Sequence, residues 1–267
     1  MLDSPACTIS LVCPNLRLQK EYILFTLNLG VGIRKALLAH TNLKDDSSLI
    51  SKLRKERNIL FKNSLDSLVK KSTKKIRILD VGGEARFWQN VDFDISKYDI
   101  TVINLLYSEE KKVGGITTKY GNALDLSFVP KESVDVIFSN SVIEHVGSWQ
   151  DQITMAKQVL SFEAPIFLQT PNYWFPMEPH FLFPFFQFLP LKVRAFLLYN
   201  FNLGEYGRMK PWERALTEVK MVRLLKKREL LKLFPSCTIR HERVMGLTSG
   251  FLVFHGWTDN NLGPLTR

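Results

Sequence analysis

The stretch ILDVGGEARFW, residues 78–88, decides the fold. A short apolar run begins at residue 76 and ends in Gly82 and Gly83, which is typical of a buried strand followed by a tight turn. In open α/β sheets, ligands bind at the carboxyl ends of the strands, where glycine lets the backbone approach them closely. The stretch therefore predicts a nucleotide-type site. A plain strand-to-helix turn capped by Asp80 is the alternative.

Asp80 indicates which nucleotide fits the turn. The dinucleotide fingerprint G-x-G-x-x-G is absent, because only Gly82 and Gly83 are present. A carboxylate at Asp80 would repel a pyrophosphate and attract an ammonium group. The turn therefore favours a nucleoside that carries a cationic amino-acid tail.

Strands of similar composition recur along the chain and alternate with helical stretches. Such alternation predicts a parallel sheet with right-handed crossovers. Further strands are expected at residues 100–106, 116–120, 134–139, 164–170, 238–244 and 250–256, and helices at 149–162 and 212–234.

Two segments flank or interrupt this pattern. Residues 1–75 are expected to form an N-terminal helical cap, with helices at 16–40 and 48–72, and residues 76–267 the main domain. Residues 172–212 are rich in proline and phenylalanine and predict an insertion on the substrate side. The insertion is core, the wall of an apolar pocket, or a membrane-docking face with a short amphipathic helix at 189–201; these alternatives stay open.

Charge and cysteine content limit the partners. The net charge of +10 is spread as +8 over residues 1–75, −5 over 76–170 and +7 over 171–267. The acidic centre suits a cationic ligand, whereas the basic ends suit an anionic substrate, a membrane surface or nucleic acid, or are solvated helix faces. The three cysteines lack zinc-type spacing, and the sequence predicts no signal peptide and no membrane span. We therefore expect a cytoplasmic protein. Peripheral contact with the inner membrane face stays open.

Three ordered blocks carry a resemblance to a known family. DVGG at 80–83 resembles the first motif, D-x-G-x-G, of class I S-adenosylmethionine-dependent methyltransferases. GNALDLSF at 121–128 and VDVIFSNSVIEHV at 134–146 resemble the family's next two blocks, and the broad type 11 group is the most similar. The resemblance implies an enzyme with an α/β, Rossmann-like fold: a seven-stranded, mainly parallel sheet with helices on both faces.

The resemblance also implies S-adenosylmethionine as cofactor and a set of residues around it. Asn104 stands where an acid that binds the ribose is usual, and Glu84 and Arg86 stand where glycines are usual. Ordinary turn chemistry is the alternative for Asn122. The expected cofactor-binding residues are Asp80, Gly82, Gly83, Asn104, Leu105, Asn122, Ala123, Asn140 and Ser141.

Two histidines are the expected catalytic residues. Methyl transfer is a displacement at a sulfonium carbon, in which the protein aligns the nucleophile and removes its proton. His145 follows Glu144 in the third block, and His180 lies after the fifth strand, where Glu178 would set its tautomer. The alternatives are an architectural role for His145 and a packed core position for His180. No cluster predicts a metal.

The expected acceptor is a small molecule or a glycan- or lipid-linked precursor, with transfer to oxygen favoured. The third block lacks the N-P-P-Y motif of amino-directed DNA methyltransferases, and no Pro-Cys pair suits cytosine chemistry. Nucleic acid is therefore not the expected partner. An RNA methyltransferase using the basic ends and a non-catalytic binding protein on the same fold stay open as alternatives.

Overall fold

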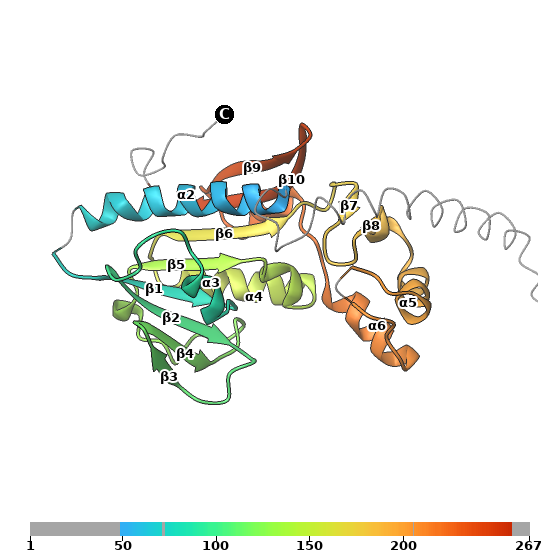
Figure 1. The fold of residues 1–267 in the computed structure, drawn as a ribbon, viewed down its shortest axis with the longest axis horizontal. Helices are drawn as coiled ribbons and strands as arrows, with labels where there is room; N and C mark the ends of the chain where they lie inside the picture. Colours follow the sequence, from blue (N-terminus) through green and yellow to red (C-terminus); the bar gives the residue numbers. More distant parts are fainter. Residues whose placement is uncertain (1–48, 71–72, 205, 258–267) are drawn as a thin grey trace, which may run out of the picture.

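The computed structural model describes residues 49–70, 73–204 and 206–257 (Figure 1). The expected helix at 16–40, and with it most of the expected cap, lies outside the described residues. In chain order the elements are α2 (Leu49–Val69), β1 (Ile76–Val81), α3 (Ala85–Gln89), β2 (Tyr98–Asn104), β3 (Lys111–Val113), β4 (Ile116–Tyr120), η1 (Lys131–Ser133), β5 (Val136–Asn140), η2 (Ile143–His145), α4 (Trp149–Leu160), β6 (Ile166–Pro171), β7 (Met177–Glu178), β8 (Phe183–Pro184), η3 (Phe186–Phe188), α5 (Leu191–Asn200), α6 (Trp212–Met221), α7 (Lys227–Leu233), β9 (Thr238–Val244) and β10 (Leu247–His255).

One sheet organises the fold. Its strand order is β3-β4-β2-β1-β5-β6-β10-β9. Strands β4, β2, β1, β5 and β6 are parallel to their neighbours in this series, whereas β10 runs antiparallel to both β6 and β9. The short β3 adds an antiparallel edge beside β4. The expected mainly parallel α/β sheet is thus confirmed, with one strand more than the seven expected.

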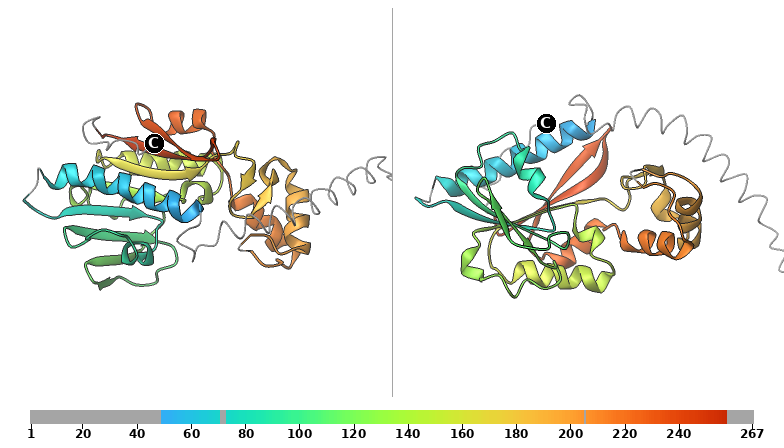
Figure 2. Two further views of the ribbon diagram at one scale, coloured as in Figure 1. Left: turned by 45° about the horizontal axis from the view of Figure 1, so that its top comes forward. Right: turned by 60° about the horizontal axis from the view of Figure 1, so that its bottom comes forward.

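Helices cover both faces of the sheet (Figure 2). They do so because successive side chains of each strand point to opposite faces, and both faces are apolar. On β1, Ile76 and Ile78 join the cluster under α2 and α3, whereas Leu79 and Val81 join the cluster under α4 and α7. Phe61 of α2 is buried against the rings of Phe138 and Phe167, with centroids 4.7 and 4.8 Å apart. The sheet therefore has a separate apolar core on each side.

The aromatic insertion forms a lobe beside the end of the sheet, built from β7, β8, η3 and α5 (Figure 1). A third apolar cluster fills this lobe and includes the buried rings of Phe181 and Phe186 together with side chains of α5 and α6. Other aromatic side chains remain exposed. They are Trp174, Phe185, Phe188, Phe196 and Phe201. Within the described residues, no helix is both long and apolar enough to cross a bilayer.

The single helix expected at residues 212–234 is wrong. Two helices, α6 and α7, occupy this stretch, and residues 222–226 between them are extended. Leu225 forms a bridge with Asn172, and the N–H of Arg223 donates to the carbonyl of Glu144 at 2.8 Å. Pairing with chain segments far away in sequence interrupts the helix, and a local apolar pattern carries no sign of such pairing.

Candidate active site

Asp80 lies at the end of β1 and is completely enclosed. The indole N–H of Trp88 donates to Asp80 Oδ2 at 2.7 Å. Asp80 Oδ1 is buried and has no hydrogen-bond partner among the described residues. Burial raises the pKa of this carboxyl to about 7, and the Trp88 hydrogen bond opposes the rise. The carboxyl therefore keeps one unused acceptor directly beneath the glycine turn.

The glycine turn packs against Asp80 on one side and the end of β5 on the other. Gly82 has a φ of +83°, and a Cβ at this position would lie 2.3 Å from Val142 Cγ1. A Cβ on Gly83 would lie 2.0 Å from Asp80 Oδ2. Both contacts are far shorter than van der Waals distance, so neither position accepts a side chain. The next residue, Glu84, has a φ of −124° and needs no glycine, which accounts for the departure from the family's usual spacing.

Asn104, at the end of β2, braces this turn in the structure. Its side-chain amide donates to the carbonyls of Gly82 and Gly83, both at 2.9 Å, and its Oδ1 accepts from the N–H of Leu106 at 3.0 Å. The expected contact of Asn104 with a ribose thus stays a prediction. The neighbouring Leu105 is exposed, as the apolar wall of a nucleoside site would be.

Asn122 and Asp125 form a turn after β4. Asn122 Oδ1 accepts from the N–H of Leu124 at 3.0 Å, and Asp125 Oδ1 accepts from the N–H of Ser127 at 3.1 Å. These are the side-chain-to-backbone bonds of ordinary Asx turns. The adenine-binding role expected for Asn122 and Ala123 stays a prediction, carried by their place at the carboxyl end of the sheet.

A buried polar network holds Asn140 and Ser141 at the end of β5. Arg57 of α2 donates to Asn140 Oδ1 and, at 2.8 Å, to Glu242 of β9. Ser141 donates to Gln169 Oε1 at 2.6 Å, and Gln169 donates in turn to Glu242 Oε2 at 3.0 Å. No sequence motif singles out Arg57, Gln169 or Glu242. Spacing could not have revealed them, because the network joins elements up to 185 residues apart.

The structure brings the two expected catalytic histidines together. His145 Nε2 and His180 Nε2 lie 3.0 Å apart, although the residues are 35 positions apart in sequence. Glu178 Oε1 lies 2.7 Å from His180 Nδ1, which is the pairing expected from the sequence. The other oxygen of Glu178 accepts from the N–H of Phe181 at 2.7 Å. The fully buried carboxylate therefore fixes the ring of His180, with Nδ1 as donor to Glu178 and Nε2 as acceptor.

Glu144 and His145 complete the cluster from η2. The carboxyl of Glu144 is fully buried and accepts from Thr170 Oγ1 at 2.9 Å, while its Oε1 lies 3.9 Å from His180 Nε2. Burial raises the pKa of Glu144. Burial, followed by the proximity of His180, lowers the pKa of His145 to about 4. His145 is therefore neutral at physiological pH and is a weak base, so it can serve as the hydrogen-bond donor to His180.

Two groups of residues are candidates for holding a cofactor or a metal. The unpartnered Oδ1 of Asp80 beneath two obligatory glycines, with exposed Leu105 nearby, fits a cationic nucleoside. In the described part of the chain, ligand-type atoms of Glu144, His145 and His180 lie within 4.8 Å of one another. The hydrogen bond between the two histidines explains their approach without an ion.

One family model matches the part of the chain that contains the glycine turn. Residues 78–166, about a third of the chain, match a family model described as a methyltransferase domain, Methyltransf_11. No curated protein matches the chain significantly.

Solved structures with a similar fold include S-adenosylmethionine-dependent methyltransferases. One from Mesorhizobium loti is 14% identical, with a TM-score of 0.42, over 72% of this chain and 96% of its own. One from Aquifex aeolicus is 12% identical, with a TM-score of 0.36, over 72% and 87%. A Rhodobacter sphaeroides protein described as a candidate zinc-dependent alcohol dehydrogenase is 9% identical, with a TM-score of 0.43, over 75% and 88%. Scores this low add nothing to the assignment, which rests on the family match and on the sheet with its glycine turn. Residues 78–166 therefore correspond to a methyltransferase domain of the Methyltransf_11 type, and this match supports an S-adenosylmethionine-dependent methyltransferase.

Proposed function

We propose that the enzyme methylates a hydroxyl group of a small-molecule, glycan or lipid-linked acceptor, with His180 as the general base. The observation that carries this proposal is the Glu178–His180–His145 chain, whose contacts measure 2.7 and 3.0 Å. A hydroxyl must lose its proton as the new bond forms, whereas its pKa is far above neutrality. A fixed, neutral imidazole is therefore the group that such an acceptor needs.

Each residue of the chain has a separate task. Glu178 accepts from His180 Nδ1 and leaves the Nε2 lone pair to take the proton of the acceptor hydroxyl. Glu178 and, at 3.9 Å, Glu144 stabilise the imidazolium that results. His145 donates to His180 Nε2 before the acceptor arrives and gives up this bond to the acceptor hydroxyl.

Val142 connects the glycine turn to the segment that carries His145. Val142, whose side chain would contact a Cβ on Gly82, precedes the η2 turn that ends at His145. Asp80 and the glycine turn would hold the amino-acid part of S-adenosylmethionine, with the ionised carboxyl of Asp80 attracting its ammonium group. When bound, the cofactor supplies a methyl group that is already activated as a sulfonium. The protein's contribution is alignment and proton removal.

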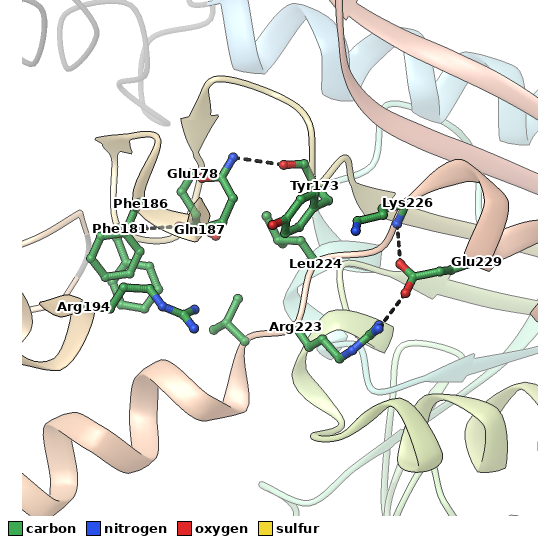
Figure 3. A pocket seen from close by; sticks show the side chains of 11 residues that line it. Tyr173, Glu178, Phe181, Phe186, Gln187, Arg194, Arg223, Leu224, Lys226 and Glu229 are labelled. Atoms are coloured by element: carbon green, nitrogen blue, oxygen red, sulfur yellow. Dashed lines mark hydrogen bonds and ion pairs between the residues drawn. The ribbon is translucent and has the colours of Figure 1, made fainter. Parts of the chain in front are cut away.

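A cavity lined by Glu178, the partner of His180, favours a small acceptor. Glu178 also lines a cavity of about 270 Å³ between the aromatic lobe and α7 (Figure 3). This volume suits a sugar- or phenol-sized group, whereas an RNA chain would need an open, basic groove. The cavity therefore supports the small-molecule, glycan or lipid-linked class over the RNA alternative.

The test replaces His180 with Gln and measures formation of S-adenosylhomocysteine against a panel of sugar, phenol and lipid-linked hydroxyl acceptors. We expect kcat to fall about 10²–10⁴-fold, with S-adenosylhomocysteine affinity unchanged by calorimetry. The variant His241→Gln on β9 is the matched control and keeps its rate. Methyl incorporation into RNA with a steep loss of binding at high salt, or an undiminished rate in the His180 variant, would overturn the proposal.

A further inference from the structure

The cavity beside Glu178 contains more positive charge than its own residues neutralise. Arg194, Arg223 and Lys226 line it, together with the carboxylates of Glu178 and Glu229. Figure 3 shows Arg194 entering from α5 on one side, with Lys226 on the opposite side. Whether the cavity attracts a charged ligand depends on which of these groups are already paired.

Every oxygen of the two carboxylates accepts a hydrogen bond. Glu178 uses one oxygen for His180 Nδ1 and the other for the N–H of Phe181, both at 2.7 Å. Glu229 accepts from Arg223 Nη2 at 2.6 Å and from the backbone N–H of Lys226 at 2.8 Å. Neither acid forms an ion pair with Arg194 or with the ammonium group of Lys226 among the described residues.

Of the cations, only Arg223 is neutralised within the described part of the chain. Its Nη2 is paired with Glu229, and its Nη1 donates to Gln152 Oε1 at 2.6 Å.

Arg194 is partly buried, and its Nε is enclosed without a hydrogen-bond partner among the described residues. Burial lowers the pKa of this guanidinium, although the nearby Glu178 opposes the effect. No described carboxylate forms an ion pair with Arg194. An enclosed Nε–H with no acceptor is costly, and a ligand that bonds to this guanidinium would reduce the cost.

Lys226 supplies a second unpaired charge. Its Nζ lies 4.6 Å from the centre of the Tyr173 ring and 5.2 Å from that of Trp174. These cation–π contacts orient the ammonium group and leave its N–H donors without a carboxylate among the described residues. Phe181 and Phe186 form an apolar wall of the same cavity.

We propose that this cavity binds an oxyanion group, a phosphate or a carboxylate, of the methyl acceptor. The guanidinium fork of Arg194 matches either group bidentately, and Lys226 adds a point charge. Because Glu178 lines the cavity and also contacts His180 Nδ1, an acceptor anchored here lies one side chain away from the base. This inference rests on the proposed function for the identity of the ligand as an acceptor, but the anion site itself does not depend on it.

The test is calorimetric titration of the full chain with inorganic phosphate, acetate and benzoate at constant ionic strength. We expect Arg194→Gln to weaken binding of the preferred anion at least about tenfold. Lys192→Gln removes the same charge from an exposed position on the same helix and is the matched control. We expect its affinity to stay within about twofold of the parent protein. Preference for phosphate identifies a phosphorylated acceptor, and preference for benzoate identifies a carboxylate on an apolar body.

Two results would overturn the anion site: no anion binds the parent protein, or the Lys192 variant loses as much affinity as the Arg194 variant. Should Arg194→Gln fail to fold by circular dichroism, Lys226→Gln takes its place with the same expected loss. S-adenosylhomocysteine is titrated into the same samples. If S-adenosylhomocysteine does not bind the parent protein, the proposed function is contradicted, whereas the anion measurement remains valid.

Discussion

Arg57 is the residue through which α2 is tied to the candidate active site. Its side chain is 12% exposed, and that of its partner Glu242 is 7% exposed. Removing one member of a buried ion pair leaves the other charge uncompensated in a medium of low polarity, at a cost of about 3–5 kcal/mol. Asn140 loses its Arg57 donor in the same step. We therefore expect Arg57→Leu to lower the free energy of unfolding by about 3–5 kcal/mol.

Urea unfolding at pH 7, followed by tryptophan fluorescence, measures this loss. Lys62→Leu on the same helix is the matched control, because Lys62 and Asp66 are 41% and 37% exposed. Such an exposed pair contributes about 0–1 kcal/mol. The double variant Arg57→Leu/Glu242→Gln removes the stranded charge and should regain part of the lost stability. The reasoning fails if the Arg57 variant costs no more than the Lys62 variant, or if the double variant is the least stable of the three.

Three further predictions follow from other contacts. Glu178→Gln should lower kcat about 10²–10⁴-fold and leave S-adenosylhomocysteine affinity unchanged. If kcat and this affinity fall by the same factor, Glu178 has only a structural role. Without cofactor, stability should fall as the pH rises from about 4 to about 7, because folded Asp80, with its pKa raised from 3.8 to about 7, keeps a proton that the unfolded chain has released. Asp80→Asn should remove that slope in urea titrations, and an unchanged slope would contradict the burial of this carboxyl. Phe61→Ala should cost about 3–5 kcal/mol in the same assay, and a loss below that of an exposed ring such as Phe196→Ala would show that α2 does not close the core.

The sequence by itself determined the mainly parallel sheet and the glycine turn that follows its strand β1. The apolar run at residues 76–81 and the glycines that follow are local signals, because a strand and a tight turn depend on the φ and ψ preferences and the polarity of adjacent residues. Asp80 could be singled out as a candidate ligand-binding carboxylate for the same reason, because it lies two residues before Gly82 in the sequence. Glu178 and His180 are two positions apart, so their hydrogen bond could also be predicted from the sequence.

Only the tertiary structure decided which distant residues meet. His145 and His180 lie 3.0 Å apart because η2 and the lobe after β6 converge at one edge of the sheet. Other tertiary contacts divide residues 212–234 into two helices, orient Asn104 toward the carbonyls of the glycine turn and bring Arg57 next to Glu242. These contacts join segments whose separation along the chain carries no periodic signal, and the free energy that selects them comes from burial and hydrogen bonding in the assembled core.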